Sequence, residues 1–274
     1  MTFEDRGMEM KEMMKKLWKS RKTEEKVGLA LGGGATLGAA HVGVLRALEE
    51  AEVAIDCIAG TSIGAMVGAF YAFGMPVDEI EQIALELDWP DISGIALSKR
   101  GLLNNDEMGK LLDKYLGDVY FDDADIPFAA VTTDISTGEK VILDEGDVSE
   151  AVKASTCIPV LFEPIKYNGR LLVDGGLKES VPLSAIQNMG AEFTIGVDLN
   201  AHRKYKRPEN ILDILNNTLE IALKHLANVD SREIDLLIQP NLAEFSRSET
   251  KDIDKMILEG YRTAKNMLDQ KEIG

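Results

Sequence analysis

Cysteine is scarce in this sequence, and its scarcity limits the ways in which the chain can be held together. The two cysteines, Cys57 and Cys157, lie far apart and in apolar surroundings. That arrangement fits a reducing compartment better than a disulfide framework. Neither cysteine has a second Cys or a His beside it at the spacing of metal ligands, so we expect no zinc site.

Positive charge is also in short supply. The chain has 30 Lys and Arg residues against 47 Asp and Glu residues, which gives a formal net charge of −17. An acidic surface argues against nucleic acid as a partner, because phosphates attract Lys and Arg. For the same reason we do not expect the whole surface to lie on an anionic membrane.

Long apolar runs are missing as well. No run reaches the roughly 18 residues that a membrane-spanning helix needs, and no apolar segment typical of a signal peptide follows Met1. Together with the acidic charge, these absences predict a soluble, cytoplasmic protein that binds no nucleic acid.

The sequence does have a regular alternation of strand and helix patterns from Val27 onward. Hydrophobic residues make up 45% of its 274 residues, enough for a substantial core. The alternation predicts a three-layer α/β/α fold around a central, mostly parallel sheet. The expected strands are residues 27–31, 55–59, 128–133, 140–143, 171–173, 193–197 and 234–238. The expected helices are residues 39–51, 65–73, 78–87, 106–116, 148–155, 211–226 and 253–268.

Residues 1–25 differ from the rest of the chain and predict a separate amphipathic helix. Within residues 10–22, apolar side chains recur at helical spacing and basic side chains occupy the opposite face. Such a helix packs on the domain or on a partner subunit, or it makes peripheral contact with a membrane surface. The apolar face consists of Met10, Met13, Met14, Leu17 and Trp18.

The pentapeptide GTSIG, residues 60–64, follows an apolar strand pattern and precedes a helical one. It matches the motif G-x-S-x-G, in which a strand turns sharply into a helix and the serine at the bend has a strained backbone. Gly60 and Gly64 let the chain close without clashes. The oxygen of Ser62 then projects near a helix N-terminus, which favours an anion. The pattern predicts that Ser62 is a nucleophile; an ordinary tight turn is the alternative.

Three glycines, Gly32, Gly33 and Gly34, stand between the first predicted strand and the first predicted helix. Their backbone N–H groups can point at a phosphate or at the oxyanion of an acyl-transfer intermediate. Nucleotide motifs fit poorly, because no Lys follows Gly38 as in a Walker loop and Leu37 replaces the last glycine of a dinucleotide fingerprint. We therefore favour an oxyanion hole; a plain strand–helix crossover is the alternative.

A nucleophilic serine needs a base, and the sequence offers two kinds. The chain has three histidines, and a conventional Ser–acid–His order would require His202 or His225. Asp174 is the other candidate, because it follows an apolar strand and a carboxylate sheltered from water is a better base than an exposed one. Gly175 and Gly176 follow it, and an Asp that closes a Gly-Gly turn is common. The residues by themselves leave this choice open.

Three motifs in one order resemble those of the patatin-like phospholipases: GGGATLGAAHVGVL, then GTSIG, then DGG. The stretches TTDISTGEKVIL and ASTCIPVLFEPIKYNGRLLVDGG are similar to the middle and closing segments of that family. The resemblance covers roughly residues 26–196. It implies a patatin-like α/β fold with a Ser–Asp dyad in place of a triad.

The resemblance also implies a role for each candidate residue. Ser62 matches the nucleophile, Asp174 matches the base, and the three glycines match the oxyanion loop, with the N–H of Ile63 as a further donor. The expected activity is hydrolysis of fatty-acyl esters, of the phospholipase A, lysophospholipase or carboxylesterase type, without a metal or organic cofactor. Residues 26–274 would then form one acyl hydrolase domain whose partner is a lipid or acyl-ester substrate.

Leu37 departs from the family pattern, which commonly has Arg or Lys at this position. The departure leaves an alternative open, in which the chain is a catalytically weak or inactive lipid-binding protein. A Ser–His–Asp hydrolase that uses one of the later histidines is the other competing interpretation.

Overall fold

The computed structural model describes residues 25–87, 94–95, 103–202, 207, 217–218, 221, 233–246 and 250–271. The helix predicted for residues 1–25 lies outside these residues except for Glu25, so its membrane contact stays a prediction. The helix predicted for residues 211–226 also lies outside them, apart from three positions.

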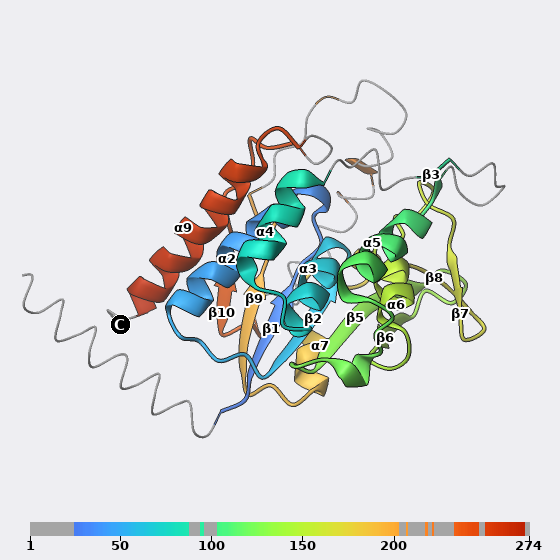
Figure 1. The fold of residues 1–274 in the computed structure, drawn as a ribbon, viewed down its shortest axis with the longest axis horizontal. Helices are drawn as coiled ribbons and strands as arrows, with labels where there is room; N and C mark the ends of the chain where they lie inside the picture. The colour runs from blue at the N-terminus through green and yellow to red at the C-terminus, as the bar shows by residue number, and fades with distance from the viewer. Residues whose placement is uncertain are drawn as a thin grey trace, which may run out of the picture.

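Eight of the described strands form one sheet in the order β10-β9-β1-β2-β5-β8-β7, with β6 also paired to β5. The strands from β10 to β5 run parallel, and β6, β7 and β8 add antiparallel pairs at one side (Figure 1). These strands are β1 (Val27–Leu31), β2 (Cys57–Thr61), β5 (Phe128–Asp134), β6 (Lys140–Leu143), β7 (Ile165–Tyr167), β8 (Arg170–Asp174), β9 (Phe193–Val197) and β10 (Leu236–Ile238). A separate pair joins β3 (Gly94–Ile95) to β4 (Leu103–Asn104).

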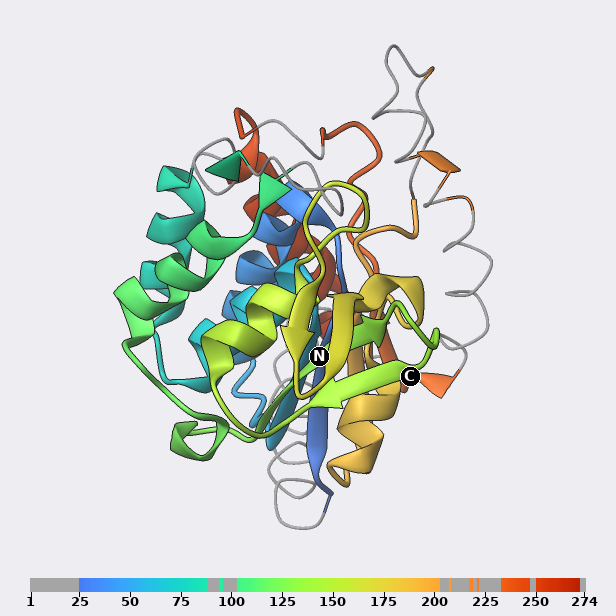
Figure 2. The same ribbon diagram turned by 90° about the vertical axis from the view of Figure 1, so that its right-hand side faces the viewer.

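Helices cover both faces of the sheet, which confirms the predicted three-layer fold (Figure 2). One face carries α2 (Ala39–Glu50), α3 (Ile63–Ala72), α4 (Val77–Glu86), α5 (Asp106–Leu116), α6 (Val148–Ser155) and α9 (Ile253–Lys271). The other face carries the short α7 (Leu183–Asn188). Single turns of 3-10 helix are η1 (Ala35–Gly38), η3 (Phe121–Asp123) and η4 (Gly175–Leu177).

Strand residues alternate between the two faces, as the two-residue period of a β-strand requires. In β1, Leu29 and Leu31 pack into the thick helical layer, whereas Ala30 packs toward α7. In β2, Ile58 faces the thick layer and Ala59 faces α7. Small side chains on the second face let α7 lie close to the sheet. The larger part of the core lies on the other side, among α2, α3 and α9.

Several short elements were not predicted from the sequence, among them β3, β4, α7 and β7. Helix α7 has only six residues, too few to show a helical period. Strand β7 forms a hairpin with β8 through Asn168 and Gly169, which both have positive φ. An Asn-Gly pair of this kind is a strong hairpin signal, and it was available in the sequence.

Both cysteines are free and buried. Within the described part of the chain, no group of three or more His, Cys, Asp or Glu side chains is placed to hold a metal ion. None of the described helices is both long enough and apolar enough to cross a membrane.

Candidate active site

The sharp turn predicted for GTSIG is confirmed, and it is tighter than the sequence suggested. Strand β2 runs to Thr61 and helix α3 begins at Ile63, so Ser62 alone makes the turn. Its backbone is strained, with φ 55° and ψ −125°. A Cβ on Gly64 would lie 2.1 Å from the carbonyl oxygen of Leu31, so only glycine fits there. The strand and the helix both extend further toward Ser62 than expected.

Ser155 holds the backbone of this turn from the next layer. The Ser62 N–H donates a hydrogen bond to Ser155 Oγ at 2.9 Å, and Ser155 Oγ donates to the carbonyl of Val131 at 2.7 Å. Ser155 is fully buried, and Ser62 is 9% exposed. The turn at Ser62, here called the elbow, is therefore held by the buried hydroxyl of Ser155. Sequence analysis missed this residue because it lies 93 positions from Ser62 along the chain.

Asp174 ends β8 at a second turn. Its N–H donates to the carbonyl of Cys157 at 2.8 Å, and its Oδ1 accepts a hydrogen bond from the Gly176 N–H at 2.8 Å. A Cβ on Gly175 would lie 2.2 Å from the carbonyl oxygen of Val131. The DGG motif is therefore needed for close packing against β5 as well as for turning the chain.

The strand register brings the two turns to the same level of the sheet. Thr61 pairs with Val131 across β2 and β5, and Thr132 pairs with Asp174 across β5 and β8. Ser62 and Asp174 thus flank the same part of β5, with backbones roughly 10 Å apart at two strand spacings. Side chains that lean toward each other over β5 can meet across such a gap.

The glycine loop lies directly against the elbow, since a Cβ on Gly33 would lie 3.4 Å from that of Ser62. Two backbone N–H groups of the loop already donate hydrogen bonds within the protein. Gly32 N–H donates to the carbonyl oxygen of Val197 and Gly33 N–H to that of Ser180, both at 3.0 Å. Among the described residues, the structure shows no acceptor for the N–H groups of Gly34 and Ile63.

Two side chains hold the carbonyl groups of this loop. Asn200 Nδ2 donates to the Gly33 carbonyl, and His41 Nε2 lies 2.8 Å from the Gly32 carbonyl oxygen, the same distance as the Asn200 contact. The C=O and N–H of a trans peptide point in opposite directions. Because Asn200 fixes the Gly33 carbonyl, it also turns the Gly34 N–H the opposite way.

His41 is fully buried, and burial lowers its pKa to about 4. The ring is therefore neutral near pH 7, and Nε2 carries the proton because its partner is a carbonyl oxygen. Nδ1 has no hydrogen-bond partner among the described residues. His41 thus supports the loop. Of the two histidines considered as bases, His202 is exposed and His225 lies outside the described residues.

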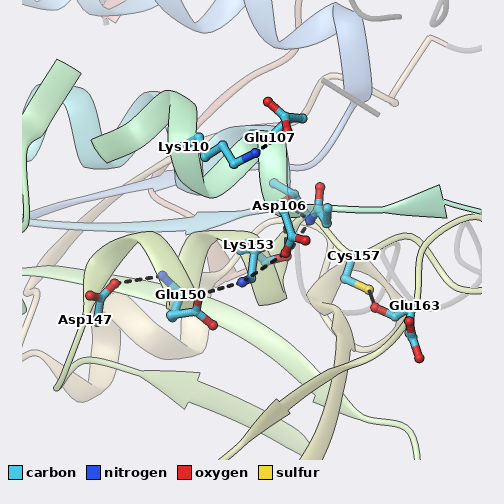
Figure 3. Close-up of polar contacts among 10 residues, drawn as sticks. Asp106, Glu107, Lys110, Asp147, Glu150, Lys153, Cys157 and Glu163 are labelled. Carbon is cyan, nitrogen blue, oxygen red and sulfur yellow. Dashed lines mark hydrogen bonds and ion pairs between the residues drawn. The ribbon is translucent and has the colours of Figure 1, made fainter. Parts of the chain in front are cut away.

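Ser155 and Cys157 thus support the two turns. Figure 3 shows contacts that hold the end of α6 and the Cys157 thiol in place. Lys153 lies 3.6 Å from Asp106 of α5, and Asn105 donates to the Lys153 carbonyl at 2.7 Å. The thiol of Cys157 donates to the carbonyl of Glu163 at 3.2 Å. Burial, reinforced by the charge of Asp174, raises the pKa of this thiol to about 12, so it stays protonated.

Leu37 is 3% exposed and packs into the thick helical layer. Its N–H donates to the Gly34 carbonyl at 3.2 Å. The position at which the family commonly has a cation is therefore part of the apolar core in this chain.

Comparison with known proteins gives several relatives. An NTE family protein of Mycobacterium tuberculosis is 36% identical over 178 residues, which cover 64% of this chain and 49% of that protein. Neuropathy target esterase of Drosophila melanogaster is 30% identical over 187 residues, covering 65% of this chain and 13% of its own. A lysophospholipase of Emericella nidulans is 32% identical over 189 residues, covering 64% and 12%. The chain spans about half the length, or less, of these relatives.

Two solved structures share the fold. VipD from Legionella pneumophila superposes with a TM-score of 0.63 at 15% identity, covering 90% of this chain and 67% of VipD. ExoU from Pseudomonas aeruginosa superposes with a TM-score of 0.51 at 14% identity, covering 91% and 53%. The sequence profile of the family described as patatin-like phospholipase matches residues 29–186. This chain therefore belongs to the patatin-like phospholipase family.

Proposed function

We propose that this protein is a serine acyl hydrolase that cleaves the fatty-acyl esters of lipids, with Ser62 as nucleophile and Asp174 as base. The observation that carries the proposal is the register that sets the strained turn of Ser62 level with Asp174 across β5. Membership of the patatin-like phospholipase family supports it, as do relatives that are named lysophospholipases. The activity is of the phospholipase A, lysophospholipase or carboxylesterase type.

The reaction proceeds in two acyl transfers. Asp174 accepts the proton of the Ser62 hydroxyl while Ser62 Oγ attacks the ester carbonyl carbon. The tetrahedral intermediate collapses, and the alcohol leaves with the proton that Asp174 returns. Water then gives a proton to Asp174 and attacks the acyl-serine, and Ser62 leaves as the fatty acid is released, taking the proton back from Asp174.

The N–H groups of Gly34 and Ile63 are the oxyanion donors in this proposal, since neither has an acceptor among the described residues. Gly32 and Gly33, also predicted as donors, shape the loop instead, because their N–H groups bind protein carbonyls. Ile63 is the first residue of α3, where the helix dipole adds positive partial charge.

Labelling with a fluorophosphonate, followed by peptide mass mapping, tests the dyad. We expect wild type to be labelled on Ser62, and Ser62→Ala and Asp174→Asn to lose both labelling and ester hydrolysis by several orders of magnitude. In the second variant the amide oxygen of the new side chain can still accept the Gly176 N–H, so the turn itself is preserved. Near-full activity of Asp174→Asn would refute the dyad.

Two matched variants separate the competing interpretations. His202→Ala and His225→Ala are expected to keep the activity of wild type, and its loss in either would favour a Ser–His–Asp hydrolase. A folded wild type that binds lipid but shows neither labelling nor hydrolysis would favour an inactive lipid-binding protein. Liposome co-sedimentation with and without residues 1–25 tests the membrane contact predicted through residues 10–22.

A further inference from the structure

A buried carboxylate, that of Glu179, lies beside the candidate site and has no role in the proposed reaction. Its side chain is 4% exposed, and both of its oxygens have partners. Oε1 accepts the Ser184 N–H at 2.8 Å, and Oε2 accepts the Ser184 hydroxyl at 2.6 Å and the Lys140 ammonium at 2.9 Å. A buried charge persists in a fold only where such partners compensate for the loss of water, so the position of Glu179 is tightly specified.

The backbone of the same segment bonds to all three motifs of the candidate site. The Glu179 N–H donates to the carbonyl of Gly175, which follows the candidate base, at 2.9 Å. The Glu179 carbonyl accepts the hydroxyl of Thr61, which precedes the candidate nucleophile, at 3.1 Å. The Ser180 carbonyl accepts the N–H of Gly33 at 3.0 Å. These two consecutive residues therefore connect the turn of the DGG motif, the elbow and the glycine loop.

The bond from Gly33 to Ser180 matters because glycine residues leave the loop much conformational freedom. Gly33 is held at both ends, by Ser180 at its N–H and by Asn200 at its carbonyl. That carbonyl also fixes the direction of the Gly34 N–H across the same peptide plane. A shift of the Ser180 carbonyl would release one end of Gly33 and change where the candidate oxyanion donor points.

Two neighbouring elements hold the side chain of Glu179, and through it the segment 179–180. Ser184 lies in the first turn of α7, and Lys140 is the first residue of β6, which pairs with β5. Lys140 also donates to the Ser184 hydroxyl at 2.5 Å. The Lys140 side chain is 33% exposed, so the network runs from the surface of the sheet to the segment that binds the glycine loop.

We propose that Glu179 is a positioning residue, which holds the Ser180 carbonyl in place and so keeps the Gly34 N–H aimed at the oxyanion. The inference rests on the proposed hydrolase function, since this oxyanion forms during acyl transfer to Ser62. An oxyanion donor binds the transition state more strongly than it binds the ester. A donor that points elsewhere therefore lowers kcat and leaves KM nearly unchanged.

Steady-state hydrolysis of p-nitrophenyl butyrate by Glu179→Gln tests the proposal. The new side chain keeps the size of the old one and an oxygen for the Ser184 N–H, but it loses the charge that pairs with Lys140. We expect kcat to fall roughly tenfold and KM to stay within about twofold of wild type. The double variant Glu179→Gln/Lys140→Met should lose no more kcat than Glu179→Gln alone, because both substitutions break one network.

Asp134→Asn is the matched control. Asp134 is also 4% exposed, accepts a backbone N–H, that of Ser136, at 2.9 Å, and lies 3.5 Å from a partly exposed cation, Arg170. These contacts hold the turn after β5 and the start of β8, so this variant should lose stability but keep the kcat of wild type. An unchanged kcat in folded Glu179→Gln, or an equal fall in Asp134→Asn, would overturn the positioning role.

Hydrogen exchange at the Gly33 amide, measured by NMR, tests the role without any turnover. We expect this exchange to be roughly tenfold faster in Glu179→Gln than in wild type or Asp134→Asn, because the Ser180 acceptor is less well held. If wild type hydrolyses no ester, the proposed function fails, and the exchange rate alone decides the role of Glu179. If Glu179→Gln does not fold, Lys140→Met takes its place, and an unchanged Gly33 rate in that variant would equally reject the proposal.

Discussion

Ser62 and Asp174 both stand at a sharp turn where a strand ends, but the two turns hold their residues differently. Ser62 has φ 55°, and backbone atoms crowd the elbow around Gly64. Asp174 has an ordinary φ of −47°, and its own carboxylate caps the Gly176 N–H. Backbone atoms crowd both turns, at Gly64 and at Gly175. The turns differ in that the Ser62 backbone is strained and is held by the Ser155 hydroxyl, whereas the Asp174 carboxylate caps its own turn.

The same short segment nevertheless supports both turns. Ser155 accepts the Ser62 N–H through its hydroxyl, and Cys157 accepts the Asp174 N–H through its backbone carbonyl. A side-chain substitution can remove the Ser155 hydroxyl, but it cannot remove the backbone carbonyl of Cys157. The comparison therefore predicts that substitution of the supporting residue disturbs the elbow more than the acid turn.

Replacing one glycine in each turn should have the largest effect. A Cβ at Gly64 meets the Leu31 carbonyl oxygen at 2.1 Å, whereas a Cβ at Gly176 meets Asp174 Oδ1, a rotatable atom, at 3.0 Å. We expect Gly64→Ala to lower the free energy of unfolding by about 3 kcal/mol and Gly176→Ala by less than about 1 kcal/mol. Urea denaturation measures both. Equal losses would mean that contact with a rotatable carboxylate oxygen costs as much as contact with a backbone carbonyl oxygen.

The pH dependence of stability tests the side-chain support of the glycine loop. The pKa of His41 is lowered to about 4 in the fold from its ordinary 6.5. The unfolded chain therefore binds more protons between these two pH values, and the stability that neutral His41 allows is lost as pH falls through this window.

We expect the free energy of unfolding of wild type to fall by up to about 1.4 kcal/mol per pH unit relative to His41→Gln, between pH 6.5 and about 4. Gln keeps an N–H donor for the Gly32 carbonyl but does not titrate. Chemical denaturation at several pH values gives the two curves, and their difference cancels the titration of the carboxylates. Parallel stability curves for the two proteins would show that burial of His41 does not make stability depend on pH in this range.

Removing Ser155 should have a smaller effect on stability than Gly64→Ala but a clear effect on turnover. Ser155→Ala leaves the Ser62 N–H without its acceptor, which should cost about 1 to 2 kcal/mol of unfolding free energy and roughly tenfold in kcat. Cys157→Ala is the matched control, because the backbone carbonyl that binds Asp174 remains. Thermal denaturation and steady-state hydrolysis compare the pair. A larger loss of kcat in Cys157→Ala would reverse the order proposed for the two turns.

The local elements were largely predictable from the sequence. The predicted bounds of β1, β6, β9, α5 and α6 agree with the structure, because each has a clear hydrophobic period. Strand β2 was predicted two residues too early, since its last two residues, Gly60 and Thr61, carry no hydrophobic signal. The short α7 and β7 were missed. The order and hydrophobic pattern of the segments thus predicted the layers of the fold, and tertiary packing shifted the ends of individual strands and helices.

The candidate site was predictable only in part. Ser62 and Asp174 stand in recognisable motifs, because strand–turn–helix geometry and Gly-Gly turns depend on neighbouring residues. Ser155, Asn200 and His41 carry no such mark, since their partners are distant in sequence or are backbone carbonyls.

The sequence by itself determined the parallel α/β class, the two glycine-lined turns and the residues that stand at them, because these follow from local sterics and hydrophobic period. Only the tertiary structure decided that β8 pairs antiparallel with β5, which sets Asp174 level with the elbow. It also decided which loop amides are already bonded and which lack an acceptor among the described residues. These features depend on contacts between distant segments, and a hydrogen bond across such a distance leaves no periodic trace in the chain.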